Sequence, residues 1–242
     1  MSASKEIVLP HSERIIRLKR IPVLENLSDA ALQSVADKCK WRNCSAGEQI
    51  LCRDDSSTDV LFLLAGTARA VSYSQEGKAV VFVDLKPDAM FGEIAAIDRK
   101  QRSASVEALE RCTIASLSAD HFEQLMLGEP SVAIATLRHV VAHVRRLSER
   151  VFEFSTLAVR NRIHTELLRL ARGVSQEHAQ VTLSPAPSLS DIADRISTHR
   201  EAVSRELSRL KAIGLLRRER GNLVITNIRK LSELVGEAKA EM

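Results

Sequence analysis

The chain has 242 residues, of which 45% are hydrophobic, which is enough for one large packed domain or two ordinary ones. It contains no run of about 18 apolar residues, so a membrane-spanning helix is excluded, and its first residues lack the apolar stretch of a secretory signal. We therefore expect a cytoplasmic protein with no membrane partner.

The net charge of +4 is unevenly distributed along the chain. Residues 160–242 hold 15 Lys and Arg against 10 Asp and Glu, a net charge of +5, which leaves −1 for the rest. Basic residues are concentrated between Arg200 and Arg220. Because clustered positive charge attracts polyanions, this part is expected to meet nucleic acid; a solvated helix face is the alternative.

The first half of the chain is expected to form a short helix and then a β-domain. Leu27–Lys38 has helical apolar spacing with Ser28 as N-cap. From Gly47 onward, short β-rich runs alternate with turn residues, and Glu76-Gly77 predicts a hairpin turn. Many short strands without intervening helices favour an antiparallel barrel or jelly roll. The predicted strands are Gln49–Cys52, Val60–Leu64, Ala68–Tyr73, Ala79–Leu85 and Ser105–Leu109.

After Ala119 the pattern becomes helical, and Ser131–Ala158 contains neither Pro nor Gly, which predicts one long helix. Alternating spacings of three and four residues are typical of a coiled-coil seam, and they predict a parallel dimer. The seam positions are Ile134, Leu137, Val141, Val144, Ser148 and Val151. Ser148 interrupts the apolar series, either as a tolerated polar residue that sets the register or as a hydroxyl offered to a ligand.

Two short helices with a turn between them are expected near the C-terminus. Ser188 and Asp191 are spaced as a capping box for the first. Thr198 and Glu201 are spaced in the same way for the second, after a turn at Ser197. The pattern predicts a helix-turn-helix.

This pair of helices has expected neighbours on both sides. A helix ends at about Leu170, and a break covers Gly173–Pro187. After the pair, Leu215-Leu216 and Leu223–Thr226 flank the turn-forming triplet Arg220-Gly221-Asn222. The hairpin predicted here would be the wing of a winged helix.

The outward face of the second helix carries the residues expected to contact DNA. Arginine can donate two hydrogen bonds to guanine O6 and N7, and glutamate can accept from the amino group of cytosine. The alternatives are that the glutamate only caps the helix and that the arginines touch only phosphate. The expected DNA-binding residues are Arg200, Glu201, Ser204, Arg205 and Arg209.

Two stretches of the β-domain, Phe91–Ile97 and Arg102–Val106, carry the chemistry of an anion site. Gly92 allows close approach of the backbone, successive amides can cradle a phosphate, and Arg102 can neutralise its charge. Glu93 can accept a hydrogen bond from a sugar hydroxyl. A surface turn with an ion pair would explain the same residues.

Together these stretches resemble the phosphate-binding cassette of cyclic-nucleotide receptors, and the chain from about Leu27 to Ile225 resembles the Crp/Fnr family, in its cyclic-AMP receptor branch. The resemblance implies an α+β fold of three parts. Residues 1–130 would be an antiparallel β jelly-roll domain that binds a cyclic nucleotide, 131–158 a dimerisation helix, and 159–242 a winged helix-turn-helix domain.

The resemblance also implies roles for the matching residues of the cassette. Glu93 would bind the ribose 2′-hydroxyl, and Arg102 and Ser103 would bind the cyclic phosphate. Lining of the turn would fall to Gly92, Ile94 and Ala95.

On the long helix, Ser148 matches a serine that reaches the base from the partner subunit. Leu147 stands where the family pattern has threonine, so one base contact is lost. Ser103 is similar to positions that favour cyclic GMP in some receptors. The expected ligand is therefore cyclic AMP, with cyclic GMP close behind, and no metal is expected.

In the second helix of the C-terminal pair, Arg200-Glu201 and Arg205 match residues that read GTGA-type half-sites. The expected function is a homodimeric transcriptional regulator in which the nucleotide controls binding to palindromic double-stranded DNA. RNA polymerase is a further partner that the resemblance implies.

Three alternatives remain. Cys39, Cys44, Cys52 and Cys112 could hold an iron–sulfur cluster in a redox-sensing regulator, although they do not lie in an N-terminal extension. A regulator that binds DNA without a nucleotide would keep Glu93 and Arg102 as relics. An enzyme is not expected, because the histidines are scattered and no nucleophile-and-base arrangement or metal-ligand spacing is evident.

Overall fold

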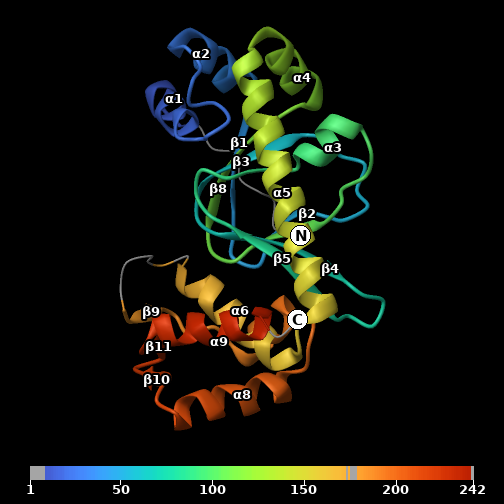
Figure 1. Cartoon of the computed structure of the whole chain (residues 1–242). Helices are drawn as coiled ribbons and strands as arrows, with labels where there is room; N and C mark the ends of the chain where they lie inside the picture. The colour runs from blue at the N-terminus through green and yellow to red at the C-terminus, as the bar shows by residue number, and fades with distance from the viewer. Residues whose placement is uncertain (1–8, 173, 175–178, 241–242) are drawn as a thin grey trace. The chain divides into compact units, whose positions relative to one another are not determined.

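The structure is a computed structural model that describes residues 9–172, 174 and 179–240. The chain divides into two compact units, Met1–His143 and Val144–Met242, and the boundary falls within the longest helix, α5 (Pro130–Thr156). Figure 1 shows the order of the elements along the chain. No helix in the described part of the chain combines the length and apolar character needed to cross a bilayer. The two units are considered separately below.

Two helices open the first unit, α1 (His11–Lys19) and α2 (Asp29–Lys38). The Ser28 hydroxyl accepts a hydrogen bond from the Ala31 amide at 3.2 Å, which confirms the predicted N-cap of α2. Helix α1 was not predicted because its sequence is largely polar; only Leu18 within it is fully buried.

The β-domain consists of two four-stranded antiparallel sheets, in the orders β1-β8-β3-β6 and β2-β7-β4-β5. Apolar side chains from both sheets share one core, which includes Leu61 and Ile114 of the first sheet and Val106 of the second. This arrangement confirms the predicted antiparallel jelly-roll class. The strands are β1 (Lys40–Cys44), β2 (Gln49–Leu51), β3 (Val60–Ala65), β4 (Ala68–Tyr73), β5 (Ala79–Leu85), β6 (Met90–Phe91), β7 (Ser105–Ala108) and β8 (Cys112–Leu117).

The structure adds three strands that sequence patterns did not reveal: β1, β6 and β8. Strand β1 carries Lys40 and Arg42 among its five residues, which hides the β pattern, yet it pairs with β8 along its whole length. Strand β6 has two residues, too few for any periodicity. The hairpin turn at Glu76-Gly77 is as predicted, and it joins β4 to β5.

Three helices follow the strands or interrupt them. Helix α3 (Glu93–Asp98) lies between β6 and β7, and α4 (Ala119–Gly128) precedes α5.

The apolar seam side chains of α5 are between 43% and 64% exposed, and Ser148 is exposed as well. An apolar stripe of this kind is uncommon on the surface of a monomer.

The second unit, after the end of α5, packs four helices around a three-stranded sheet of order β10-β11-β9. Strands β10 and β11 form the predicted hairpin, whose turn has positive φ at Arg220 (46°) and Gly221 (84°). Its elements are α6 (Val159–Arg172), β9 (Val181–Leu183), α7 (Leu189–Arg195), α8 (Arg200–Ala212), β10 (Leu216–Glu219), β11 (Asn222–Ile225) and α9 (Ile228–Ala240).

Two details of this unit differ from the sequence-based expectations. The turn at Ser197, with a φ of 51°, is where it was predicted, but the N-cap of α8 is His199, one residue after the predicted Thr198, which is buried. The expected break at Gly173–Pro187 contains β9, while residues 173 and 175–178 lie outside the described part.

Candidate functional site

The candidate anion site is centred on Gly92, which links β6 to α3 with a φ of 78°. A Cβ at this position would lie 2.7 Å from Arg102 Nη1 and 3.1 Å from the Asp59 carbonyl oxygen. Both the backbone conformation and the close approach therefore require glycine, as the sequence analysis expected.

Arg102 is 3% exposed, and three neutral oxygens hold its guanidinium. Nη1 donates to the Gly92 carbonyl at 2.9 Å, Nη2 to the Asp59 carbonyl at 2.8 Å, and Nε to the Ser57 hydroxyl at 3.1 Å. Burial lowers the pKa of Arg102 from its ordinary value, while Asp59 and Asp55 oppose the shift. Within the described residues no carboxylate forms an ion pair with it, so the site holds a buried positive charge that lacks a direct counterion.

A guanidinium has five N–H donors, and three are used by the protein. Two donors remain for an anion. Next to Arg102, Ser103 is exposed. On α3, Ile94 is 43% exposed and Ala95 is buried.

Glu93 follows Gly92 directly, and its carboxylate faces two histidines of α5. Its Oε1 atom lies 3.3 Å from His143 Nδ1 and 3.7 Å from His139 Nε2. Burial favours the neutral acid, but the two imidazoles outweigh it, and the pKa of Glu93 falls to about 2. Sequence reasoning missed the histidines, although their spacing of four residues places them on one face of the helix.

Leu147 and Ser148, the predicted ligand-site residues of α5, belong to the second unit and are exposed. Ser148 is the expected base contact, whereas Leu147 stands where one base contact is lost. A ligand contact from these residues would come from a partner subunit, as the resemblance implies.

In the second unit, α7 and α8 form the expected helix-turn-helix. The Ser188 hydroxyl accepts from the Asp191 amide at 2.9 Å, which confirms the predicted cap of α7. Helix α8 buries Val203, Leu207 and Leu210. Its opposite face exposes four of the expected DNA-binding side chains: Arg200, Glu201, Ser204 and Arg205.

The fifth predicted DNA-binding residue, Arg209, forms an ion pair within the domain. It donates to Glu206 Oε1 at 2.7 Å, and this bond raises its pKa. Glu206 is buried and also lies 2.6 Å from Nε2 of the fully buried His164 on α6. The three side chains fasten the recognition helix to α6.

The second unit should lose stability as the pH falls below neutrality, because burial lowers the pKa of His164 from its ordinary value of 6.5. A proton then binds the unfolded chain before the folded one, so the free energy of unfolding is greatest above pH 6.5 and declines as the pH falls towards the folded pKa. Thermal unfolding of wild type and His164→Gln from pH 8 to 5 checks this. A decline of equal steepness in both proteins would contradict the assignment.

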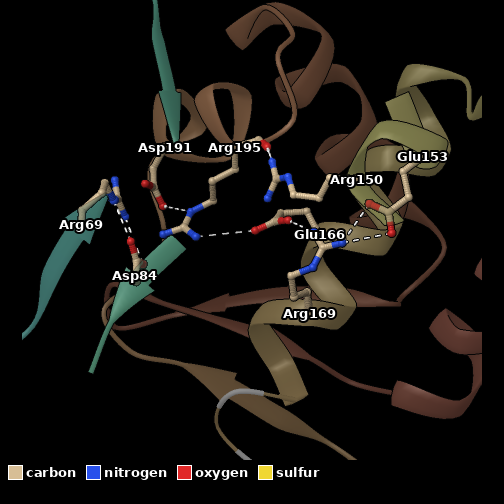
Figure 2. Close-up of polar contacts among 8 residues, drawn as sticks. All are labelled: Arg69, Asp84, Arg150, Glu153, Glu166, Arg169, Asp191 and Arg195. Atoms are coloured by element: carbon tan, nitrogen blue, oxygen red, sulfur yellow. Dashed lines mark hydrogen bonds and ion pairs between the residues drawn. The ribbon is translucent and has the colours of Figure 1, made fainter. Parts of the chain in front are cut away.

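A second polar network joins the last turns of α5 to α6 and α7, as Figure 2 shows. Arg169 Nη2 contacts both Glu153 oxygens, at 2.8 and 3.0 Å, and Nη1 contacts Glu166. Glu166 lies 3.6 Å from Arg195 of α7, and Arg150 donates to the Arg195 carbonyl. Glu153, Glu166 and Arg195 are all buried. A buried charge without a partner would destabilise the fold, so these ion pairs are needed for stability.

The cysteines do not form a cluster site. Cys39, Cys44 and Cys112 are buried, whereas Cys52 is exposed. Burial raises the pKa of Cys39 to about 12 and that of Cys44 to about 11, which disfavours the thiolate that a cluster requires. In the part of the chain that the structure describes, they belong to no group with metal-ligand geometry.

Two family models match the chain, one to each functional region. The model for the cyclic nucleotide-binding domain matches residues 41–129, and the model for the Crp-like helix-turn-helix domain matches residues 161–234. The first range contains Glu93 and Arg102, and the second contains the whole of α8.

Known proteins with the same organisation span nearly the whole chain. A CRP-like cAMP-activated global transcriptional regulator from Mycobacterium tuberculosis is 19% identical over 89% of this chain and 96% of its own length. The c-di-GMP responsive regulator CLP of Xanthomonas campestris has a TM-score of 0.71 at 16% identity, over 82% of this chain and 99% of its own. A variant of CooA from Carboxydothermus hydrogenoformans has a TM-score of 0.73 at 18% identity, over 89% of this chain and 94% of its own. With a cyclic nucleotide-binding domain followed by a Crp-like helix-turn-helix, this chain belongs to the Crp/Fnr family of transcriptional regulators, which are not enzymes.

Proposed function

We propose that this regulator is a homodimer in which a cyclic nucleotide, cyclic AMP before cyclic GMP, controls binding to palindromic GTGA-type operators. The observation that carries the proposal is the buried Arg102 guanidinium, which has only neutral acceptors and two spare donors. A cyclic phosphate has one negative charge and would supply the missing counterion.

Glu93 and Ser103 complete the proposed ligand site. Ser103 would hydrogen-bond the phosphate, and Glu93 would accept from the ribose 2′-hydroxyl. The backbone at Gly92, Ile94 and Ala95 would line the turn, as in the family cassette. To bind the ribose, Glu93 would have to give up its contact with His139 or His143. Ligand binding would therefore depend on the packing of α3 against α5.

The base would contact the partner subunit at Ser148, with Leu147 contributing apolar surface in place of a second hydroxyl. Both residues are exposed on α5, Ser148 at a position of the seam that would form the dimer and Leu147 next to it in the sequence. We assume that the helix pair can adopt two arrangements. A ligand that contacts both the cassette and the helix pair stabilises the arrangement that it binds more tightly, and the ratio of the two affinities sets the size of the shift.

For DNA, the proposal assigns base contacts to Arg200, Glu201 and Arg205, with Ser204 beside them. Arg209 is held by Glu206, so we assign it to orienting α8 and to phosphate contact rather than to a base. Such a regulator would act in the cytoplasm and would meet RNA polymerase at its promoters.

Arg205→Ala should relax sequence preference at one guanine of each half-site by about 1–3 kcal/mol, because a bidentate base contact is lost. Arg218→Ala, an exposed arginine on β10, serves as the control and should weaken all sequences alike. Binding to operator duplexes with each half-site base replaced in turn checks both. A uniform loss with Arg205→Ala would reassign this residue to the phosphate backbone.

The proposal as a whole is tested by calorimetric titration of the full chain with cyclic AMP, cyclic GMP and cyclic di-GMP, with and without a palindromic GTGA duplex. We expect cyclic AMP to bind most tightly and its affinity to rise when the duplex is present, since linkage is reciprocal. Operator affinity that is the same with and without each nucleotide would favour a nucleotide-independent regulator.

A further inference from the structure

We propose that Glu93, His139 and His143 form a binding site for a first-row divalent transition metal ion, with Zn²⁺ as its representative. The three side chains come from α3 and α5 of the first unit. Their ligand atoms all lie within 4.8 Å of one another.

The spacing of these atoms suits a tetrahedral ion. Two ligands that each lie about 2.1 Å from a tetrahedral metal are about 3.4 Å apart. The Glu93 Oε1 atom is 3.3 Å from His143 Nδ1 and 3.7 Å from His139 Nε2. An ion placed between the three side chains would therefore require only small rotamer adjustments.

The ligand types match this class of metal. Two imidazoles and one carboxylate bind Zn²⁺ and its first-row neighbours, whereas Mg²⁺ and Ca²⁺ prefer oxygen ligands alone. Three protein ligands leave a fourth position for water or another small ligand.

Burial gives a second, independent argument. Glu93 is 2% exposed, and the buried His139 Nε2 atom has no hydrogen-bond partner. A buried polar atom without a partner costs free energy, and metal coordination would satisfy it. The His139 and His143 side chains are each about one quarter exposed, so an ion could reach the site from solvent.

The helix geometry separates this site from the dimer seam. His139 and His143 are four residues apart, so they point from the same face of α5. The seam residues Leu137 and Val141 alternate with them in sequence and lie on another face, where they are exposed. A metal ion and a partner helix could thus bind α5 at the same time.

Metal binding would also engage the carboxylate that the proposed function assigns to the ribose. This part of the inference rests on the proposed function: the ion and the cyclic nucleotide would compete for Glu93. Zn²⁺ should then raise the apparent Kd for cyclic AMP, and cyclic AMP should raise that for Zn²⁺ by the same factor.

The site is tested by titrating Co²⁺ into the untagged, metal-free full chain and following visible absorption. All proteins carry Cys52→Ser, so that the exposed thiol cannot act as a ligand. We expect saturation at one ion per chain. His143→Ala and Glu93→Gln should each weaken binding by at least about 100-fold, since even a residue that only supports a ligand can cost that much.

His11→Ala removes an exposed histidine outside the cluster and should leave Co²⁺ binding unchanged. Circular dichroism shows which variants are folded, and His143→Ala, at a helical position where alanine is favoured, remains decisive if Glu93→Gln does not fold. Absence of Co²⁺ binding, or equal binding by His143→Ala, would overturn the site. Titration with cyclic AMP in the same samples separates the proposals, because nucleotide binding without metal binding refutes only this one.

Discussion

Replacing Arg102 with leucine should reduce the affinity for cyclic AMP and cyclic GMP by more than about 100-fold. A buried anion that loses its partner charge costs about 3–5 kcal/mol, and about 1.4 kcal/mol corresponds to a tenfold change in Kd. The side chain is 3% exposed, so water cannot replace the guanidinium as a partner for the phosphate. Calorimetric titration of the full chain measures the loss.

Two further variants make this result specific. Arg102→Lys keeps the charge but cannot reproduce the three hydrogen bonds to Gly92, Asp59 and Ser57, so it should bind more weakly than wild type and better than the leucine variant. Arg53→Leu changes an exposed arginine of the segment between β2 and β3 and should bind normally. Micromolar affinity in a folded Arg102→Leu protein would remove the anion site from the proposed function.

Placing a charge in the seam with Leu137→Glu should convert the proposed dimer to monomers and lower operator affinity by at least about 100-fold, because two linked half-site contacts become one. Leu137 is 59% exposed within a single chain, so the fold of the subunit should tolerate glutamate. Across a symmetric seam each glutamate would face its symmetry mate. Sedimentation and operator titration report the two effects.

Ala142→Glu is the matched control, because it adds the same charge to the same helix at an exposed position outside the seam. It should remain dimeric and bind the operator normally. If Leu137→Glu stays dimeric at micromolar concentration, the interface lies elsewhere, and the exposed stripe needs another partner.

The sequence predicts the elements of this fold where local patterns are strong. Strands Ala68–Tyr73 and Ala79–Leu85 have the predicted bounds, because their β-branched residues and a glycine turn define them locally. Strand β1 was missed because pairing with β8, rather than its own charged residues, stabilises it. The turn of the wing was predicted because Gly221 tolerates positive φ.

The candidate site was predicted less completely. Gly92 and Arg102 lie close together as expected: they stand before and after the short helix α3, and Arg102 Nη1 donates to the Gly92 carbonyl. The approach of His139 and His143 to Glu93 depends on how α5 packs on the β-domain, which no local pattern reveals. The bond from Arg209 to Glu206 was not predicted either. It depends on His164 of α6, which contacts Glu206 and is distant from it in the sequence.

The polar network at the end of α5 limits how far the helix-turn-helix can move relative to the last turns of this helix. Moving α7 away from α5 and α6 would break the buried Glu166–Arg195 pair, at a cost of about 3–5 kcal/mol, and the bond from Arg150 to the Arg195 carbonyl. These contacts therefore restrict the movement of α7 relative to α5 and α6. A rotation of the last turns of α5 would therefore displace α6 and α7 with them, so we expect the orientation of the helix-turn-helix to follow the end of α5.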